Sequence, residues 1–342
     1  MAVTIKDIAR ETGLSLATIS KYLNHKKIQD ENKSTIEEAI NRLNYTPNRT
    51  AQTLRSKKTM TIGIVFPNLG NYFWGPLISS VTHFFFNYGY TVITSSYYSS
   101  RITEKEVIQD LIARHVDGIV MLPYDINDKA YHVFQEVGIP VVVLDHFPIH
   151  FKDYPVDCVL SDNYGGCAQL AEYLVQKGHT HICVLSPLED SYSIAQRVRG
   201  VQEVFQKHDL ADSVLDHSFV FKSTHDIMEQ GGKRFMDTMN SPTPPTAIIF
   251  TNYFIALGAL MEASSSGYVI PDDISVVVFD DDPLFKSMYP PITSAGQNLE
   301  LLGENASKIL LRRIQGDTSD FPAKAIVPVT FNERKSVRDL NN

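Results

Sequence analysis

The segment SLATISKYLN, residues 15–24, places several short polar side chains and one lysine on a single predicted helix. In the major groove of DNA, a lysine can donate to guanine O6 or N7, and an alanine or leucine can contact a thymine methyl group. Hydroxyl side chains suit phosphate oxygens. We therefore predict that this segment contacts DNA through Ser15, Leu16, Ala17, Thr18, Ser20, Lys21 and Asn24.

A pair of short helices would position these side chains. The run TIKDIARE, residues 4–11, begins with a capping box in which Thr4 caps the helix and Asp7 reaches back. Gly13 supplies the break before the second helix, so the pair has the signature of a helix-turn-helix. A third helix over residues 30–43 offers apolar side chains that close a three-helix core. A small helical bundle with any other function could have the same pattern, but the outward-facing donors of the second helix favour DNA binding. We include Thr4 among the predicted DNA contacts.

The segment PNRTAQTLRSKK, residues 47–58, contains one large apolar side chain, Leu54, among polar, basic and small residues. Asn48 can cap a short helix that runs to about Leu54. Such a helix is unstable alone, because nucleation is costly and there is no wide apolar face to bury. The residues themselves leave open what Leu54 packs against.

The charge of the chain is unevenly distributed. Residues 1–60 contain eleven lysines and arginines against six acidic residues, a balance of +5, and the remaining residues carry 20 basic against 33 acidic side chains, a balance of −13. A basic head on an acidic body indicates an anionic partner for the head alone. The excess is modest, so charge by itself does not decide the function.

Beyond residue 60 the pattern changes to short apolar, β-branched runs that alternate with helical stretches. Continuous apolar strands are typical of sheets that helices cover on both faces, and about 280 residues are too many for one such sheet. We therefore predict an α/β fold with two subdomains and a cleft between them. The predicted strands are residues 61–67, 90–97, 117–123, 140–145, 157–162, 181–187, 246–252 and 274–281.

Ligands of open α/β sheets bind at the carboxyl ends of the strands. Reading those ends gives carboxylates, amides and aromatic rings, a set that could bind a sugar by hydrogen bonds and by stacking on its C–H faces. The same residues could also be a solvated turn or part of the core. The residues that we predict to bind a small effector from these positions are Asn71, Tyr72, Phe73, Asp145, Asn252 and Asp280.

The run TIKDIARETGLSLATISKYLN, followed by NYTPNRTAQTLRSKKTMTIGIVFP, resembles the DNA-binding start of the LacI/GalR family of bacterial transcription regulators. The body, including EYLVQKGHTHICVL and YPPITSAGQ, is similar to the effector domain of that family, whose fold is that of periplasmic sugar-binding proteins. The resemblance covers essentially the whole chain. The chain departs from the family pattern at Lys21, Gln29, Asn44, Tyr253 and Val278, where most members have Arg, Ser, Gly, Asp and Gly.

The resemblance implies a role for the second segment. In such repressors the residues that match 48–55 become a helix on the operator, and the leucine that matches Leu54 is inserted into the central base step from the minor groove. An apolar wedge surrounded by cations is a device that unstacks and kinks DNA. The DNA contacts that the resemblance implies here are Asn48, Arg49, Ala51, Gln52 and Leu54.

The resemblance also implies an effector site and a homodimer. Arg197 matches the family arginine that commonly binds effector hydroxyls, and Asn252 and Asp280 match further effector positions. Tetrameric members carry an additional C-terminal leucine heptad segment, whereas this sequence ends in FNERKSVRDLNN without a repeated apolar seam, so we expect a dimer.

Several classes of protein are disfavoured. There is no apolar run of membrane-spanning length, no signal peptide, and only three cysteines, which we interpret as reduced thiols of a cytoplasmic protein. No GxSxG, HExxH or P-loop motif is present, and the histidines of KGHTHI lack further ligands for a metal. We expect no enzyme activity, no cofactor and no metal.

The predicted domains are a helix-turn-helix at 1–46, a hinge helix and linker at 47–59, and an effector-binding and dimerisation domain at 60–342. The expected function is a regulator, most simply a repressor of carbohydrate-utilisation genes, that binds a palindromic operator and responds to a sugar or sugar derivative. Control by a protein corepressor is an alternative. A sugar-binding transport protein is a weaker one, because of the head and the missing signal peptide.

Overall fold

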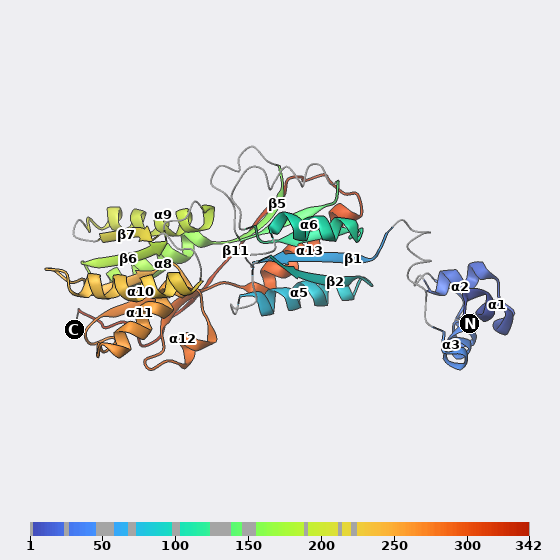
Figure 1. Ribbon diagram of the computed structural model, residues 1–342, viewed down its shortest axis with the longest axis horizontal. Helices are drawn as coiled ribbons and strands as arrows, with labels where there is room; N and C mark the ends of the chain where they lie inside the picture. The colour runs from blue at the N-terminus through green and yellow to red at the C-terminus, as the bar shows by residue number, and fades with distance from the viewer. Residues whose placement is uncertain are drawn as a thin grey trace. The chain divides into compact units, whose positions relative to one another are not determined.

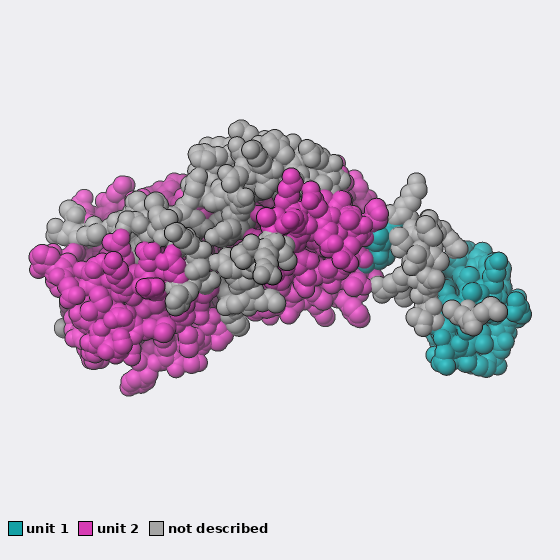
Figure 2. Space-filling view, viewed as in Figure 1, with its two compact units in different colours: residues 1–60 teal, residues 61–342 magenta. Residues whose placement is uncertain are grey.

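The computed structural model describes residues 3–23, 27–45, 58–67, 73–97, 103–123, 138–145, 155–187, 191–210, 214–219 and 224–341. The chain divides into two compact units, Met1–Met60 and Thr61–Asn342 (Figure 2). Among the described residues, no helix is long and apolar enough to cross a membrane.

Unit 1 is a three-helix domain whose helices are α1 (Ile5–Thr12), α2 (Leu16–Leu23) and α3 (Asp30–Leu43). Its small core contains the fully buried side chains Ile8, Ile19, Ile36 and Ala39, one or two from each helix. The turn between α1 and α2 begins at Gly13, whose φ of 68° lies in the left-handed region that glycine tolerates without strain. The predicted helix-turn-helix is confirmed.

The described part of unit 2 forms two six-stranded sheets (Figure 1). The first has the strand order β11-β5-β4-β3-β1-β2 and is parallel throughout. Its strands are β1 (Thr61–Phe66), β2 (Thr91–Ser96), β3 (Gly118–Met121), β4 (Val141–Leu144), β5 (Asp157–Ser161) and β11 (Lys324–Val327).

The second sheet has the order β12-β10-β9-β8-β6-β7 and is parallel except for β12, which pairs antiparallel with β10. Its strands are β6 (Ile182–Pro187), β7 (Val214–Phe219), β8 (Ala247–Phe250), β9 (Ser275–Phe279), β10 (Thr293–Gly296) and β12 (Thr330–Asn332). All eight strands predicted from apolar runs are present, and β7, β10, β11 and β12 were not predicted individually.

Helices cover both faces of each sheet, as continuous apolar strands require. In the first sheet, α6 packs on one face, and α5 and α13 lie against one another and against the strands. In the second sheet, α8 and α9 cover one face, and α10 and α11 cover the other (Figure 1). The helices of unit 2 are α5 (Trp74–Phe86), α6 (Glu104–Ala113), α8 (Asn163–Gln176), α9 (Tyr192–Lys207), α10 (Thr224–Met239), α11 (Tyr253–Ser265), α12 (Pro283–Ser287) and α13 (Leu299–Ile314).

Between the strands that the structure describes, the chain passes three times from one sheet to the other. It passes from β5 into α8, from β10 into α13 and from β11 into β12. The Asp162 N–H, in the first crossing, donates to the carbonyl oxygen of Val327 in the third at 2.8 Å. A Cβ at Gly166 would lie 2.7 Å from the Phe279 ring and 2.9 Å from Val329, so only glycine allows α8 to pack this closely.

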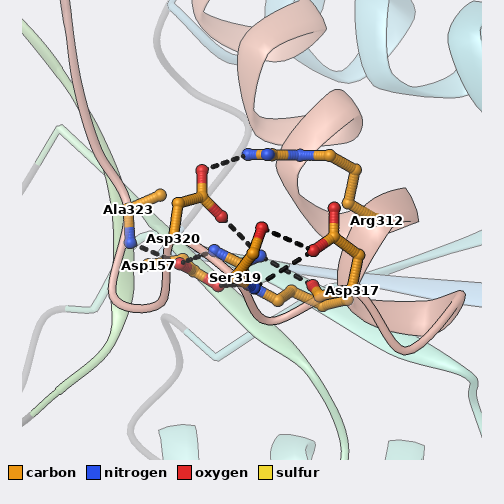
Figure 3. A network of polar contacts seen from close by, with 7 residues as sticks. Asp157, Arg312, Asp317, Ser319, Asp320 and Ala323 are labelled. Carbon is orange, nitrogen blue, oxygen red and sulfur yellow. Dashed lines mark hydrogen bonds and ion pairs between the residues drawn. The ribbon is translucent and has the colours of Figure 1, made fainter.

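A buried ion pair joins α13 to β5 of the first sheet, within the network of polar contacts in Figure 3. Arg313 donates from Nε and Nη2 to the two carboxylate oxygens of Asp157, at 2.8 and 2.9 Å, and both side chains are almost completely buried. The carboxylates of Asp157 and Asp320 raise the pKa of the Arg313 guanidinium. Asp157 also accepts from the Ala323 N–H at 2.7 Å, so the pair joins β5, α13 and the segment that leads into β11.

We expect Arg313→Met to destabilise the protein strongly. Removing one partner leaves the Asp157 carboxylate buried without its counterion, which costs about 3–5 kcal/mol. The control is Arg312→Met, which breaks only the exposed pair with Asp320 and should cost about 1 kcal/mol or less. Unfolding of both variants in urea measures the two losses, and equal losses would contradict the assignment of Arg313 as the anchor.

Candidate functional site

The outer face of α2 is open to solvent. Leu16 is 45% exposed, and Ala17 and Lys21 are exposed beside it, whereas Ile19 on the opposite face is fully buried. The helix contains no acidic residue. Within the described part of unit 1, Lys21 takes part in no ion pair, so its ammonium group is available to DNA.

The hydroxyl groups at the start of α1 and α2 are already engaged locally. Ser15 Oγ accepts from the Thr18 N–H at 3.1 Å and lies 2.9 Å from Thr18 Oγ1. Thr4 donates its hydroxyl and its N–H to Asp7 Oδ2, at 2.7 and 2.9 Å, which is the predicted capping box. These hydroxyl groups therefore hold the helix starts in place while their oxygens remain potential acceptors.

One further predicted DNA contact, Ser20, also lies on α2. Ser20 is half-buried, between the two faces of α2. The remaining predicted contacts lie outside the described residues: Asn24, Asn48, Arg49, Ala51, Gln52 and Leu54.

The two predicted aspartates of the effector site occupy equivalent backbone positions. Asp145 follows β4 and Asp280 follows β9, and their φ angles of 48° and 93° are both positive. Such angles are uncommon for residues other than glycine and are often found at functional sites. Neighbouring strands fix both, because the Asp145 N–H donates to Val159 O and the Asp280 N–H donates to Ala295 O, each at 2.9 Å.

Arg197 is 5% exposed and contributes to the framework of this region. Its Nε donates to Asn163 Oδ1 at 2.7 Å, its Nη1 donates to the Thr251 carbonyl oxygen at 2.8 Å, and its guanidinium lies 3.8 Å from the centre of the Phe279 ring. Two of its donors are thus committed to protein atoms, and its charge is held beside α8 and β8.

Ser161, the last residue of β5, is connected to all three of these charged residues. Its N–H donates to Asp145 Oδ1 at 3.4 Å. Its carbonyl oxygen accepts from Asn163 Nδ2 at 3.0 Å, and Asn163 in turn holds Arg197. Its hydroxyl donates to Gln297 Oε1 at 2.5 Å, and Gln297 Nε2 donates to Asp280 Oδ1 at 2.6 Å.

The charges of these residues act on one another. Burial raises the pKa of the Asp280 carboxyl to about 6. The positive charge of Arg197, the hydrogen bond from Gln297 and the Tyr253 backbone N–H act in the opposite direction, while the charge of Asp145 adds to the rise. Because this pKa lies above its unfolded value, Asp280 stabilises the fold in its protonated form, and that contribution is lost as the pH rises from about 4 to 6.

The remaining predicted effector residues have separate surroundings. Asn252 caps α11, with Oδ1 accepting from the N–H groups of Phe254 and Ile255, so its NH₂ group is the part that can reach a ligand. Phe73 is half-buried and lies edge-on to Trp74, whose own ring stacks on Phe66 and belongs to the core. Asn71 and Tyr72 lie outside the described residues.

Three connecting residues were not predicted. Ser161 ends a strand, so the rule that found Asp145 could have found it, but Asn163 and Gln297 carried no signal. The bond between Ser161 and Gln297 joins residues 136 positions apart, which no local pattern reveals. Ser193 was also missed, and its hydroxyl donates to the carbonyl oxygen of Asp145, which joins α9 to β4.

Comparisons with known proteins agree with this architecture. Residues 4–48 match the family described as bacterial regulatory proteins, lacI family, and residues 171–337 match the periplasmic binding protein-like domain. The chain is 28% identical to the probable HTH-type transcriptional regulator EndR of Paenibacillus polymyxa, over all of both chains. It is 27% identical to catabolite control protein A of Staphylococcus xylosus, over 99% of this chain and 100% of that one.

The solved structures agree with these matches. A lac repressor dimer bound to operator and the anti-inducer ONPF is similar, with a TM-score of 0.80 at 25% identity, covering 99% of this chain and 100% of that one. A complex of the transcriptional regulator CelR with cellobiose shares the fold, with a TM-score of 0.70 at 22% identity over 98% and 99% of the two chains. These relatives are regulators, which confirms that the chain is not an enzyme. The chain belongs to the LacI/GalR family of bacterial transcription regulators.

Proposed function

We propose that this regulator is a repressor that acts in the cytoplasm, where it binds a palindromic operator as a homodimer and is controlled by an uncharged, polyhydroxylated small molecule. The observation that carries the proposal is the convergence of Asp145, Arg197 and Asp280 on Ser161, in a chain whose other unit presents a helix-turn-helix. The proposed domains are 1–46 for DNA binding, 47–59 for the hinge helix and linker, and 60–342 for effector binding and dimerisation.

The proposal for DNA rests on the exposed face of α2. Leu16 and Ala17 supply apolar surface of the size that a thymine methyl needs, and Lys21 supplies a donor for a guanine. Lysine makes a single point contact rather than the bidentate contact of an arginine, so discrimination at that base should be moderate. Residues 48–55 would add the minor-groove contact with Leu54 as the wedge.

The proposal for the effector rests on charge. The described part of the site contains two carboxylates, Asp145 and Asp280, against one guanidinium, Arg197, which already donates to two protein oxygens. A third negative charge from a ligand would be repelled, whereas hydroxyl groups can donate to the carboxylates and accept from Arg197 and Asn252. An uncharged sugar, with Phe73 beside its C–H face, has this chemistry.

The proposal for the dimer rests on exposed apolar side chains. Met261 on α11, Leu284 on α12 and Tyr289 just after it are 57%, 42% and 100% exposed. The two helices pack together, because Tyr253 and Phe285 place their rings 5.3 Å apart. Phe86 and Tyr88 at the end of α5 are also exposed, and α5, α11 and α12 lie on the same side of unit 2 in Figure 1. Large exposed apolar patches mark protein interfaces.

We expect Lys21→Ala to reduce discrimination between operator and random DNA. The operator is obtained by selecting bound sequences from a random pool with the wild-type protein. If Lys21 contacts a base, the variant should lose about 1–3 kcal/mol on the operator and much less on random DNA. Lys33→Ala, which removes an exposed lysine from α3, should affect both DNAs equally and weakly. An equal loss on both DNAs for Lys21→Ala would assign it to a phosphate, and a pool without an enriched palindrome would contradict the proposed function.

We expect uncharged sugars to bind at least about tenfold more tightly than their uronate or phosphate counterparts, because a like charge beside a carboxylate disfavours binding. Calorimetric titration of matched pairs, such as glucose with glucuronate and with glucose 6-phosphate, measures the difference. Asp280→Asn should reduce this difference in affinity, since the amide removes the negative charge but its oxygen still accepts from Gln297. The control, Asp110→Asn on the surface of α6, should leave the difference in affinity unchanged. Tighter binding of an anionic member would disprove the assignment.

We expect a sedimentation mass of two subunits at micromolar concentration, and a shift to one subunit in Met261→Asp and Tyr289→Asp, because a charge on each copy of an apolar interface is costly to bury. Ile326→Asp is the matched control, since Ile326 is also 57% exposed but lies on β11. A mass of four subunits, or dissociation of the control alone, would contradict this surface.

A further inference from the structure

Each sheet of unit 2, with the helices that cover it, forms one half of the unit. Ser161 and Gln297 lie where the two halves are joined. Ser161 ends β5 of the first sheet at the crossing into α8, and Gln297 lies in the crossing from β10 to α13. Their side chains are hydrogen bonded to each other, and Gln297 continues to Asp280 at the end of β9 in the second sheet. These side-chain hydrogen bonds thus connect the first sheet to the second sheet, in addition to the backbone crossings.

We propose that Ser161 and Gln297 form a latch that holds the two halves in one relative position and sets the orientation of Asp280 toward the effector. Both are positioning residues: they act on the ligand through Asp280 and are not themselves required to contact it. The role in the effector response rests on the proposed function, whereas the mechanical role of the latch does not.

The hydrogen-bond chemistry gives the latch one orientation. An ionised carboxylate accepts and cannot donate, so the NH₂ group of Gln297 must face Asp280. Gln297 Oε1 then faces Ser161, whose hydroxyl is the donor that completes the chain. Oδ1 of Asp280 is engaged in this way, so Gln297 fixes the orientation of the carboxylate that the proposed ligand would meet.

The latch connects the ligand to the relative position of the halves. A ligand that displaces Asp280 weakens its bond to Gln297, and Gln297 carries the change to Ser161, which also contacts Asp145 and, through Asn163, Arg197. All three charged residues of the proposed site therefore act on one residue at a crossing. A side-chain bond between two rigid sheets has two discrete states, formed or broken, as a switch between two arrangements requires.

The test measures hydrogen exchange in peptides that carry Asp162 and Asp280, whose N–H groups donate to Val327 and Ala295. In Ser161→Ala, exchange should be about three- to tenfold faster at both positions, as expected for one lost hydrogen bond. Gln297→Met loses the bonds to both Ser161 and Asp280, so exchange at both positions should be at least as fast as in Ser161→Ala. Because both substitutions break the same chain of bonds, the double variant should exchange no faster than the faster single variant.

Ser307→Ala is the matched control. Ser307 is fully buried and donates to the Gly303 carbonyl oxygen within α13 at 2.7 Å, so the control removes one buried serine hydroxyl without touching a crossing. It should leave exchange at Asp162 and Asp280 unchanged. Faster exchange of Ser161→Ala near Asp162 alone would show a local defect and would overturn the latch, as would additive effects in the double variant or exchange at the wild-type rate in both single variants.

A second measurement separates the latch from the proposed function. On the operator selected by the wild-type protein, the two unliganded single variants should change affinity at least about threefold and in the same direction, since both release the same bond. Opposite directions, or affinities equal to wild type, would count against the latch. If the wild-type protein selects no operator, the proposed function fails, and hydrogen exchange alone decides whether the latch exists.

Discussion

Three passages of the backbone between two sheets, all at the ends of β5, β10 and β11, constrain the whole of unit 2. A single connection would leave the halves free to separate, but three closely spaced ones restrict them to rotations about the place where the chain crosses. The bond from Asp162 to Val327 ties two of these passages together, and Gly166 allows α8 to pack closely against Phe279 and Val329. Side chains beside the crossings therefore experience any rotation directly.

Two arginines among the described residues of unit 2, Arg197 and Arg313, are buried in different surroundings. Arg313 faces Asp157 in a bidentate pair and has Asp320 beside it, so its charge is fully matched and the pair serves the framework. Arg197 donates to an amide oxygen and a carbonyl oxygen and stacks on Phe279, and its charge acts through space on Asp280. The charge of Arg313 is therefore neutralised within the protein. The electrostatic free energy of Arg197, in contrast, can still change when a ligand binds.

Much of this architecture could be predicted from the sequence, because it is locally encoded. The capping box at Thr4 and Asp7 specifies α1, and apolar β-branched runs specify the central strands. Four strands were not predicted, for two physical reasons. The sequence of β10 is TSAG, which contains no large apolar side chain. β7, β11 and β12 are edge strands, which need less apolar surface than central strands. Asp145 and Asp280 could be found from the strand-end rule, but Asn163 and Gln297 act through contacts that exist only in the folded chain.

The positive φ angles of Asp145 and Asp280 restrict which side chains can replace them in the proposed effector site. In the left-handed region, β-branched and bulky side chains are strained, while asparagine and glycine are tolerated. Substitution of these two aspartates is therefore confined to a short list, in which asparagine keeps the hydrogen bonds and glycine removes them. Positions with ordinary backbone angles, such as Asn252 and Phe73, tolerate more substitutions, so we expect the two aspartates to be the least variable part of the proposed effector site.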